Sequence, residues 1–347
     1  MTIHETYMQR CLQLAKPGAG YVAPNPMVGA VLVCEDRIIG EGYHQQYGQA
    51  HAEVNCINSV READKALIEK SVLYVSLEPC AHYGKTPPCA DLIIKHNIQH
   101  VVVGCRDSYE EVNGRGIEKL LKAGVTVEVG IAEKEAIELN KRFFTFHTKK
   151  RPYIILKWAQ SSDGMIANPD YSPVKISNNT TNRLVHKWRS EEAAIMVATN
   201  TALYDNPSLT NRLWTGNQPV RLVIDKQLTL PNTLQLLDGS VKTIVFNCLL
   251  QEERDNLLFY KLPTGEDTVE AILTSLHELK IQSVLVEGGA ILLQSFIDGN
   301  CWDEARIITN STLTIGKGIV APKIKNSQLI NSNVINDDVI VNLGRMK

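Results

Sequence analysis

The chain has 347 residues, of which 44% are hydrophobic and 21% charged, a composition typical of a globular protein with room for two ordinary domains. Its formal net charge of −2 argues against the strongly basic surface of a nucleic-acid-binding protein and gives no reason to expect an anionic membrane as partner. No apolar run reaches the roughly 18 residues of a transmembrane helix. Polar residues interrupt the first apolar segment, which makes it a poor signal peptide, so we expect a cytoplasmic protein.

The first half of the chain alternates between helical and strand patterns of hydrophobic residues. Such alternation is typical of an α/β layer fold with a mostly parallel sheet. The predicted helices cover residues 4–16, 51–69, 90–95, 117–123 and 132–144, and the predicted strands cover 28–34, 38–42, 72–77, 100–104 and 125–129.

A polar, basic segment at residues 147–152 ends in a proline, which cannot continue a helix, and it is the best candidate for a linker. We therefore expect one domain over residues 1–147 and a second over 152–347. The second half again has an α/β pattern. Its predicted strands are 153–159, 193–197, 220–224, 241–246, 283–286 and 305–308, and its predicted helices are 181–190, 269–279 and 290–297.

Three residues of the first half form a candidate zinc site: His51, Cys80 and Cys89. One imidazole and two thiolates leave a fourth tetrahedral position for water, as in catalytic zinc sites. Zinc lowers the pKa of that water toward neutrality. Glu53 lies two residues after His51 at the start of a predicted helix, so its carboxylate can face the metal and carry a proton from the water to a leaving nitrogen.

The order H-x-E followed by P-C is the signature of zinc-dependent deaminases, although eight residues rather than two separate Cys80 from Cys89. The segment PCAHYGKTPPC, together with NPMVG at 25–29 and HAEVN at 51–55, resembles the deaminase half of the bifunctional riboflavin-biosynthesis enzymes. This resemblance implies a three-layer α/β/α domain of the cytidine-deaminase type.

The same resemblance implies that four residues bind the deaminase substrate: Asn25, His44, His82 and Lys85. An amide offers both a donor and an acceptor to a pyrimidine edge, and a lysine offers a positive charge to a phosphate. Other roles remain open, because Asn25 also suits the turn before Pro26 and His82 could complete a closed, structural zinc site.

In the second half, no G-x-G-x-x-G segment follows a strand, so a standard Rossmann dinucleotide site is not predicted. Instead, Lys157, Ser161, Asp163 and Gly164 fit a K-x-x-x-S-x-D-G pattern, and residues 287–289 read EGG between a strand and a helix. Together these segments resemble the reductase domain of the same riboflavin-pathway enzymes, which has a fold like that of dihydrofolate reductase. The resemblance implies NADPH as the hydride donor.

The resemblance also assigns residues to the reductase site. Those expected to contact NADPH are Ala159, Lys175, Thr201, Asp205, Gly289, Ala290, Ile291, Leu292, Leu293, Gln294 and Ser295. Those expected to contact the phosphorylated substrate are Lys157, Arg189, Leu209, Arg212 and Glu287. Lys175 stands where the family commonly has an aromatic residue.

The function that these resemblances imply has two steps. Zinc-dependent deamination of 2,5-diamino-6-(5-phosphoribosylamino)pyrimidin-4(3H)-one precedes NADPH-dependent reduction of the ribosyl group to a ribityl chain, in a protein that forms a homo-oligomer. One alternative is a deaminase whose second domain is inactive or has another use. A nucleoside or tRNA-editing deaminase predicts a basic surface and a P-C-x-x-C spacing, and a zinc-stabilised binding module predicts loss of Glu53; the sequence has none of these features.

Overall fold

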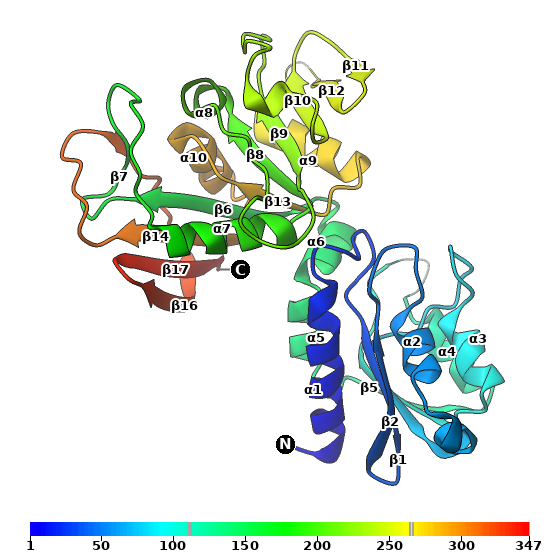
Figure 1. The fold of residues 1–347 in the computed structure, drawn as a ribbon. Helices are drawn as coiled ribbons and strands as arrows, with labels where there is room; N and C mark the ends of the chain where they lie inside the picture. The colour runs from blue at the N-terminus through cyan, green and yellow to red at the C-terminus, as the bar shows by residue number, and fades with distance from the viewer. Residues whose placement is uncertain (110–112, 264, 266, 347) are drawn as a thin grey trace. The chain divides into compact units, whose positions relative to one another are not determined.

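The computed structural model describes residues 1–109, 113–263, 265 and 267–346, and the chain divides into two compact units, Met1–Lys150 and Arg151–Lys347 (Figure 1). Each unit has its own sheet and its own hydrophobic core. Among the helices of the described residues, none has both the length and the apolar character needed to cross a membrane.

The first unit contains a five-stranded sheet in the order β2-β1-β3-β4-β5. Its strands are β1 (Gly29–Cys34), β2 (Arg37–Tyr43), β3 (Val72–Leu77), β4 (His100–Cys105) and β5 (Thr126–Val129). The expectation of a mostly parallel sheet is wrong here, because β1 pairs antiparallel with both β2 and β3, and only β3, β4 and β5 are parallel. The turn between β1 and β2 places Glu35 and Asp36 at positive φ, the backbone conformation of a tight hairpin.

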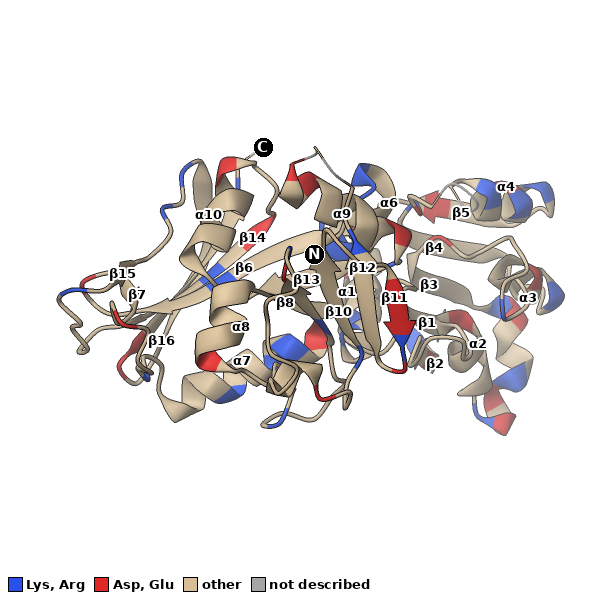
Figure 2. Ribbon diagram, turned by 90° about the horizontal axis from the view of Figure 1, so that it is seen from above, with Lys and Arg blue, Asp and Glu red and all other residues tan. Residues whose placement is uncertain are grey.

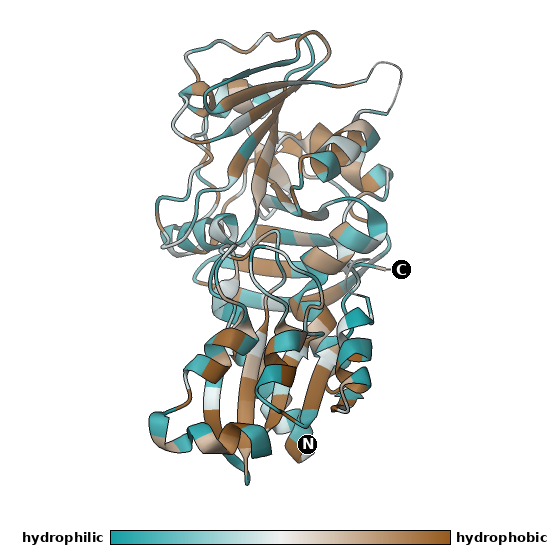
Figure 3. Ribbon diagram, turned by 90° about the vertical axis from the view of Figure 1, so that its right-hand side faces the viewer, coloured by the Kyte–Doolittle hydropathy of each residue, from teal (hydrophilic) through white to brown (hydrophobic). Residues whose placement is uncertain are grey.

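Helices cover both faces of this sheet and give the unit three layers. On one face, α2 (Ala52–Asn58), α3 (Cys89–Lys95) and α4 (Arg115–Lys122) contribute to one apolar cluster with the strands. On the other, α1 (Ile3–Ala15) and α5 (Glu133–Leu139) pack against the opposite side chains of the strands. The strands are accordingly mostly apolar, and the helices have mixed faces (Figure 3).

Two helices predicted as continuous are interrupted. The helix expected at 51–69 ends as α2 at Asn58 and is followed by the 3-10 helix η2 (Glu62–Lys70). The helix expected at 132–144 is divided at Asn140 into α5 and α6 (Lys141–Lys149). The Asn140 amide exchanges two hydrogen bonds with the backbone of Met27, at 2.8 and 2.9 Å, and so fixes the loop before β1. Since α6 extends to Lys149, the predicted linker at 147–152 is partly helical.

The second unit has a ten-stranded sheet in the order β11-β12-β10-β9-β8-β13-β6-β14-β17-β16. The strands from β12 to β14 are parallel, and the edge strands are antiparallel. Their bounds are β6 (Tyr153–Gln160), β8 (Ala194–Ala198), β9 (Val220–Ile224), β10 (Thr243–Asn247), β11 (Glu252–Arg254), β12 (Leu257–Lys261), β13 (Ser283–Val286), β14 (Glu304–Asn310), β16 (Ser327–Ile335) and β17 (Asp338–Arg345). The short strands β7 (Met165–Ala167) and β15 (Ile319–Val320) form a separate pair.

Helices again lie on both faces. The larger apolar cluster includes α9 (Thr268–Glu278) and α10 (Ala290–Asp298). The opposite face is covered by α7 (Asn179–Glu191), α8 (Thr199–Asp205) and an irregular segment around the 3-10 helix η3 (Gln235–Leu237). In the first unit, a further 3-10 turn, η1 (Lys16–Gly18), follows α1.

Candidate active sites in the two units

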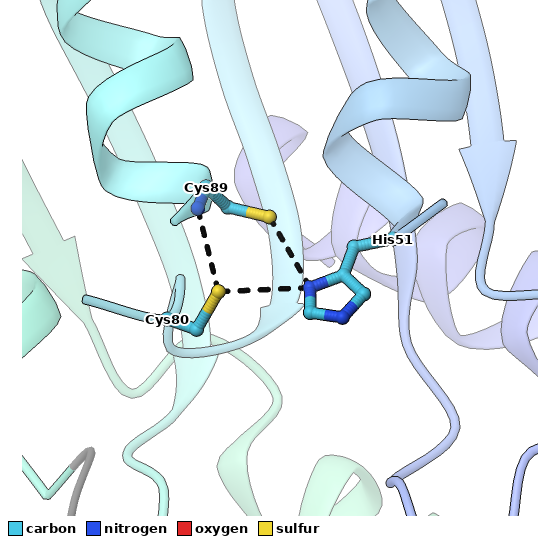
Figure 4. Close-up of side chains that lie close together, drawn as sticks. All are labelled: His51, Cys80 and Cys89. Carbon is cyan, nitrogen blue, oxygen red and sulfur yellow. Dashed lines mark hydrogen bonds between the residues drawn. The ribbon is translucent and has the colours of Figure 1, made fainter. Parts of the chain in front are cut away.

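The candidate zinc ligands come from three elements whose ends meet above the first sheet (Figure 4). His51 caps α2, Cys80 follows β3, and Cys89 is the first residue of α3. The Nδ1 atom of His51 lies 3.6 Å from Sγ of Cys80 and 3.4 Å from Sγ of Cys89. All three ligand atoms lie within 4.8 Å of one another, and two sulfurs with one imidazole nitrogen are a donor set suited to zinc.

The charges around this cluster favour a metal-binding thiolate and a nearby proton carrier. Hydrogen bonding from the Cys89 thiol holds the pKa of Cys80 well below its usual value, and the same contact raises the pKa of Cys89. Glu53, in the first turn of α2, is only 3% exposed. Burial, followed by the neighbouring Cys80 thiolate, raises the pKa of Glu53 to about 7, the range in which a carboxylate can both accept and return a proton.

Asn25 and His44 form a defined pair beside the zinc ligands. The Nδ1 atom of His44 lies 3.0 Å from the carbonyl oxygen of Ala50, so Nδ1 carries the proton and donates it. The other ring nitrogen, Nε2, therefore accepts from the Asn25 amide, 3.1 Å away. The His44 ring lies 5.2 Å from the ring of His51, and burial lowers its pKa, which keeps it neutral.

The other two predicted substrate residues lie on the loop between the cysteines. His82 has a buried Nδ1 atom that makes no hydrogen bond within the described part of the chain, so this nitrogen is available to a ligand. Lys85 is exposed, with its ammonium 4.1 Å from the centre of the Tyr47 ring. The loop also contains Thr86, whose hydroxyl lies 3.4 Å from Nε2 of His51.

In the second unit, the candidate substrate residues centre on the buried carboxylate of Glu287 at the end of β13. Arg189 of α7 donates two hydrogen bonds to it, at 2.9 and 2.7 Å, and Lys157 of β6 lies 3.7 Å away. Burial alone would raise the pKa of Glu287, but the two cations hold it at about 2. Burial lowers the pKa of Lys157.

The candidate cofactor residues lie where parallel strands end. Ala159 is near the end of β6, Thr201 lies in α8 just after β8, and Gly289 caps α10 after β13. These three strands are neighbours in the sheet, so the turns that follow them are also adjacent. A Cβ atom on Gly288 would lie 2.7 Å from the side chain of Thr201, which shows how closely the two turns approach. The first turn of α10 presents backbone N–H groups suited to a phosphate.

The structure separates the predicted residues of α10 into two groups. Ile291 is 81% exposed, and Gly289 and Ala290 lie with it at the start of the helix. By contrast, Leu292 and Leu293 point into the core, Gln294 accepts a hydrogen bond from the backbone of Lys323, and the Ser295 hydroxyl donates to the carbonyl of Ile291. The side chains of this second group are already engaged within the protein.

The remaining predicted residues have different surroundings. Lys175 and Asp205 are exposed, and Lys175 donates to Asn179 at 2.6 Å. Leu209 is buried in the core at a positive φ of 51°. The guanidinium of Arg212 donates to Ser208 and Thr210.

Sequence reasoning missed several residues that support these sites. His186 is a hydrogen-bonded core residue: it is 1% exposed, and its Nδ1 atom accepts the backbone N–H of Arg212 at 2.9 Å. Asn140 anchors the loop that carries Asn25, although it lies inside the segment 132–144 that is predicted as one continuous helix. Ser161 and Asp163, noted only as a motif, are hydrogen-bonded to each other, and Asp163 also accepts from the backbone of Ile315 and Gly316.

Comparison with known families assigns a class to each unit. Residues 1–105 match the cytidine and deoxycytidylate deaminase zinc-binding region, and residues 152–341 match the RibD C-terminal domain. With the His-Cys-Cys cluster, the fold defines a zinc-dependent deaminase joined to an NADPH-dependent reductase.

Whole-chain relatives identify the family. The riboflavin biosynthesis protein RibD of Aquifex aeolicus is 40% identical over 327 residues, covering 93% of this chain and 88% of the relative. The RibD protein of Escherichia coli is 33% identical over 319 residues, covering 86% and 85%. A diaminohydroxyphosphoribosylaminopyrimidine deaminase/5-amino-6-(5-phosphoribosylamino)uracil reductase from Thermotoga maritima superimposes with a TM-score of 0.89 at 35% identity, covering 99% of both chains.

The chain belongs to the RibD family of riboflavin biosynthesis proteins. It is a bifunctional deaminase and reductase that uses Zn²⁺ and NADPH. The predicted fold class, an N-terminal cytidine-deaminase-like domain followed by a reductase domain, is confirmed.

Proposed function

We propose that the first unit deaminates 2,5-diamino-6-(5-phosphoribosylamino)pyrimidin-4(3H)-one and that the second reduces the ribosyl group of the product. The observation that carries this proposal is the buried Glu53 beside the His51, Cys80 and Cys89 cluster, in a chain that also matches the reductase domain. The name of the Thermotoga maritima relative contains both reactions in this order.

In the deaminase site, His51, Cys80 and Cys89 would hold the metal, and Glu53 would move the proton. Bound zinc supplies the Lewis acidity that the hydrolysis needs. With a pKa of about 7, the Glu53 carboxylate takes a proton from water and passes it to the leaving amino group. This assignment of a proton carrier distinct from the ligands agrees with the general pattern of zinc deaminases.

The polar atoms of the substrate-binding residues indicate which contacts each of them makes in the deaminase. Because the NH₂ group of Asn25 is held by His44, its carbonyl oxygen is the amide atom left to accept a hydrogen bond from the pyrimidine. The Nδ1 atom of His82, which has no hydrogen-bond partner among the described residues, and the ammonium of Lys85 serve the remainder of the substrate, including its phosphate.

In the reductase site, NADPH supplies a hydride and the protein positions the sugar. We assign the cofactor phosphates to the adjacent turns at Thr201 and Gly289, where backbone N–H groups and close packing suit an anion. Lys157, Arg189 and Glu287 form a charged cluster beside the reacting sugar, and Arg212 contacts the substrate phosphate. Asp205, Lys175, Leu209 and Ala159 complete the proposed site.

We also propose that the protein is a cytoplasmic homo-oligomer with small-molecule substrates and no nucleic-acid partner. Acidic and basic residues both occur within elements such as β11 and α4, unlike the single-sign surface typical of nucleic-acid binding (Figure 2). The edge strand β16 exposes Leu329, Ile330 and Val334, an apolar edge suited to contact with another copy. Sedimentation analysis at micromolar concentration tests this state, and a monomer would contradict it.

A coupled assay tests the proposed reactions. Zinc-loaded protein receives the diaminopyrimidinone phosphoribosylamine, and ammonia release and NADPH oxidation are followed separately. We expect ammonia to be released even when NADPH is left out of the assay. We expect NADPH to be oxidised only after deamination has taken place. Ammonia release with no subsequent NADPH oxidation would support a deaminase whose second unit is inactive or has another use. Absence of both signals would overturn the substrate assignment.

A further inference from the structure

A buried carboxylate lies directly before the Pro79–Cys80 pair and has no role in the chemistry described above. Glu78 is 4% exposed and follows the last residue of β3. Its backbone N–H donates to the carbonyl of Cys105 at 3.0 Å, which continues the pairing of β3 with β4. Its side chain therefore leaves the sheet at the edge where the zinc ligands gather.

The Glu78 carboxylate accepts four backbone hydrogen bonds. Oε2 accepts from the N–H of Asp107 at 3.2 Å and of Gly114 at 3.0 Å. Oε1 accepts from the N–H of Gly116 at 3.0 Å and of Ile117 at 3.3 Å. These donors lie beyond the end of β4, at the residue that caps α4 and in the first turn of α4, where a negative charge is favourable. Both oxygens of the carboxylate thus act as acceptors at once.

The same contacts press α4 against the backbone that carries Cys80. A Cβ atom on Gly116 would lie 1.8 Å from the carbonyl oxygen of Pro79, so the helix approaches this peptide as closely as a glycine permits. The next residue is Cys80, whose sulfur accepts the N–H of Cys89 at 3.3 Å. A shift of the Pro79 peptide would therefore move one zinc ligand relative to the other two.

We propose that Glu78 is a positioning residue for the zinc site, which fixes Cys80 by holding α4 against the Pro79 peptide. This inference rests on the proposed assignment of Cys80 as a zinc ligand. Residues that support metal ligands from outside the coordination sphere typically change metal affinity by about 10- to 100-fold when they are replaced. Glu78 acts through the backbone. Because its carboxylate accepts all four hydrogen bonds, the position of the Cys80 ligand depends on the Glu78 side chain.

The test is the zinc affinity of Glu78→Gln in the full-length protein, measured by competition with a chromogenic chelator. Glutamine keeps the shape but turns one oxygen into a donor that faces two N–H groups. We expect zinc affinity to fall about 10-fold, with deaminase kcat restored at saturating zinc and the reductase rate of the same chain unchanged. Gly116→Ala, which leaves Glu78 intact but displaces Pro79, should lower zinc affinity in the same direction.

Glu41→Gln is the matched control. This variant removes a carboxylate of the same unit that accepts two hydrogen bonds from Arg10, at 2.6 and 2.9 Å. It should leave zinc affinity unchanged. Unchanged zinc affinity in either Glu78→Gln or Gly116→Ala, or an equal loss in Glu41→Gln, would overturn the positioning role. Cys80→Ser tests the assignment of Cys80 as a zinc ligand separately from the positioning role of Glu78. If this variant keeps the zinc affinity of the wild type, the ligand assignment itself fails.

Discussion

Glu53 shows how the surroundings of a side chain change what it can do. An exposed glutamate is ionised throughout the neutral range, whereas the pKa of this one is raised to about 7 by burial and by the Cys80 thiolate. Glu53→Gln keeps the size of the side chain and leaves the three ligands in place. We expect deaminase activity to fall by roughly 10²- to 10⁴-fold with zinc content unchanged. Ammonia release together with metal analysis checks this, and retained deamination would remove Glu53 from the mechanism.

His186 should make the stability of the second unit depend on pH. Burial, then the charges of Arg189 and Arg212, lower its pKa to about 4, below the value of about 6.5 in an unfolded chain. As the pH falls below 6.5, the unfolded state takes up the proton first, so stability is lost between pH 6.5 and 4. Between pH 7 and pH 5, the free energy of unfolding should fall by on the order of 2 kcal/mol more in the wild type than in His186→Gln.

Tryptophan fluorescence can measure this effect in one unit alone. All four tryptophans, Trp158, Trp188, Trp214 and Trp302, belong to residues 151–347. Denaturant titrations followed by this signal therefore report the reductase unit. If the free energy of unfolding changes with pH in the same way in the wild type and in His186→Gln, groups other than His186 dominate the pH dependence.

At the scale of elements, the turn from β13 into α10 has to combine an unusual backbone with close packing. Gly289 has a φ of 79°, and a Cβ atom there would lie 3.1 Å from the Cβ atom of Ala198. Gly289→Ala strains this turn by about 1–3 kcal/mol, so we expect the Kd for NADPH to rise about tenfold or more while ammonia release is unaffected.

Gly239→Ala is the matched control for this turn. Gly239 also has a positive φ, of 73°, but apart from its chain neighbours no atom of the described residues lies within 4 Å of its would-be Cβ. This variant should lose some stability and keep its NADPH affinity, as measured by fluorescence titration. A similar Kd in both variants would show that the turn at Gly289 does not form the cofactor site.

At the scale of the whole molecule, the two units have separate sheets and separate cores, so chemistry lost in one should leave the other intact. Removal of zinc with a chelator should abolish ammonia release and spare NADPH oxidation when the deaminated intermediate is supplied. Added zinc should restore the first reaction. Loss of both activities on zinc removal, with recovery of both, would mean that the reductase also depends on the metal.

Local patterns in the sequence predicted most elements of the fold. The strand at 72–77 and the strand at 283–286 coincide with β3 and β13, because short β-branched runs between polar segments have few other ways to be buried. No strand is predicted after residue 308, although β16 and β17 complete the large sheet there. An edge hairpin with one exposed strand lacks the continuous apolar run that marks a buried strand.

The sequence by itself determined the chemistry of this protein: a zinc donor set with an adjacent carboxylate, and segments that resemble a known deaminase and reductase. Those features depend on residue type and spacing along the chain. Only the tertiary structure decided which groups support them, because Glu78, Asn140 and His186 act on residues far away in the sequence. Burial and neighbouring charge set the pKa values of Glu53 and Glu287, and neither property exists until the chain has folded.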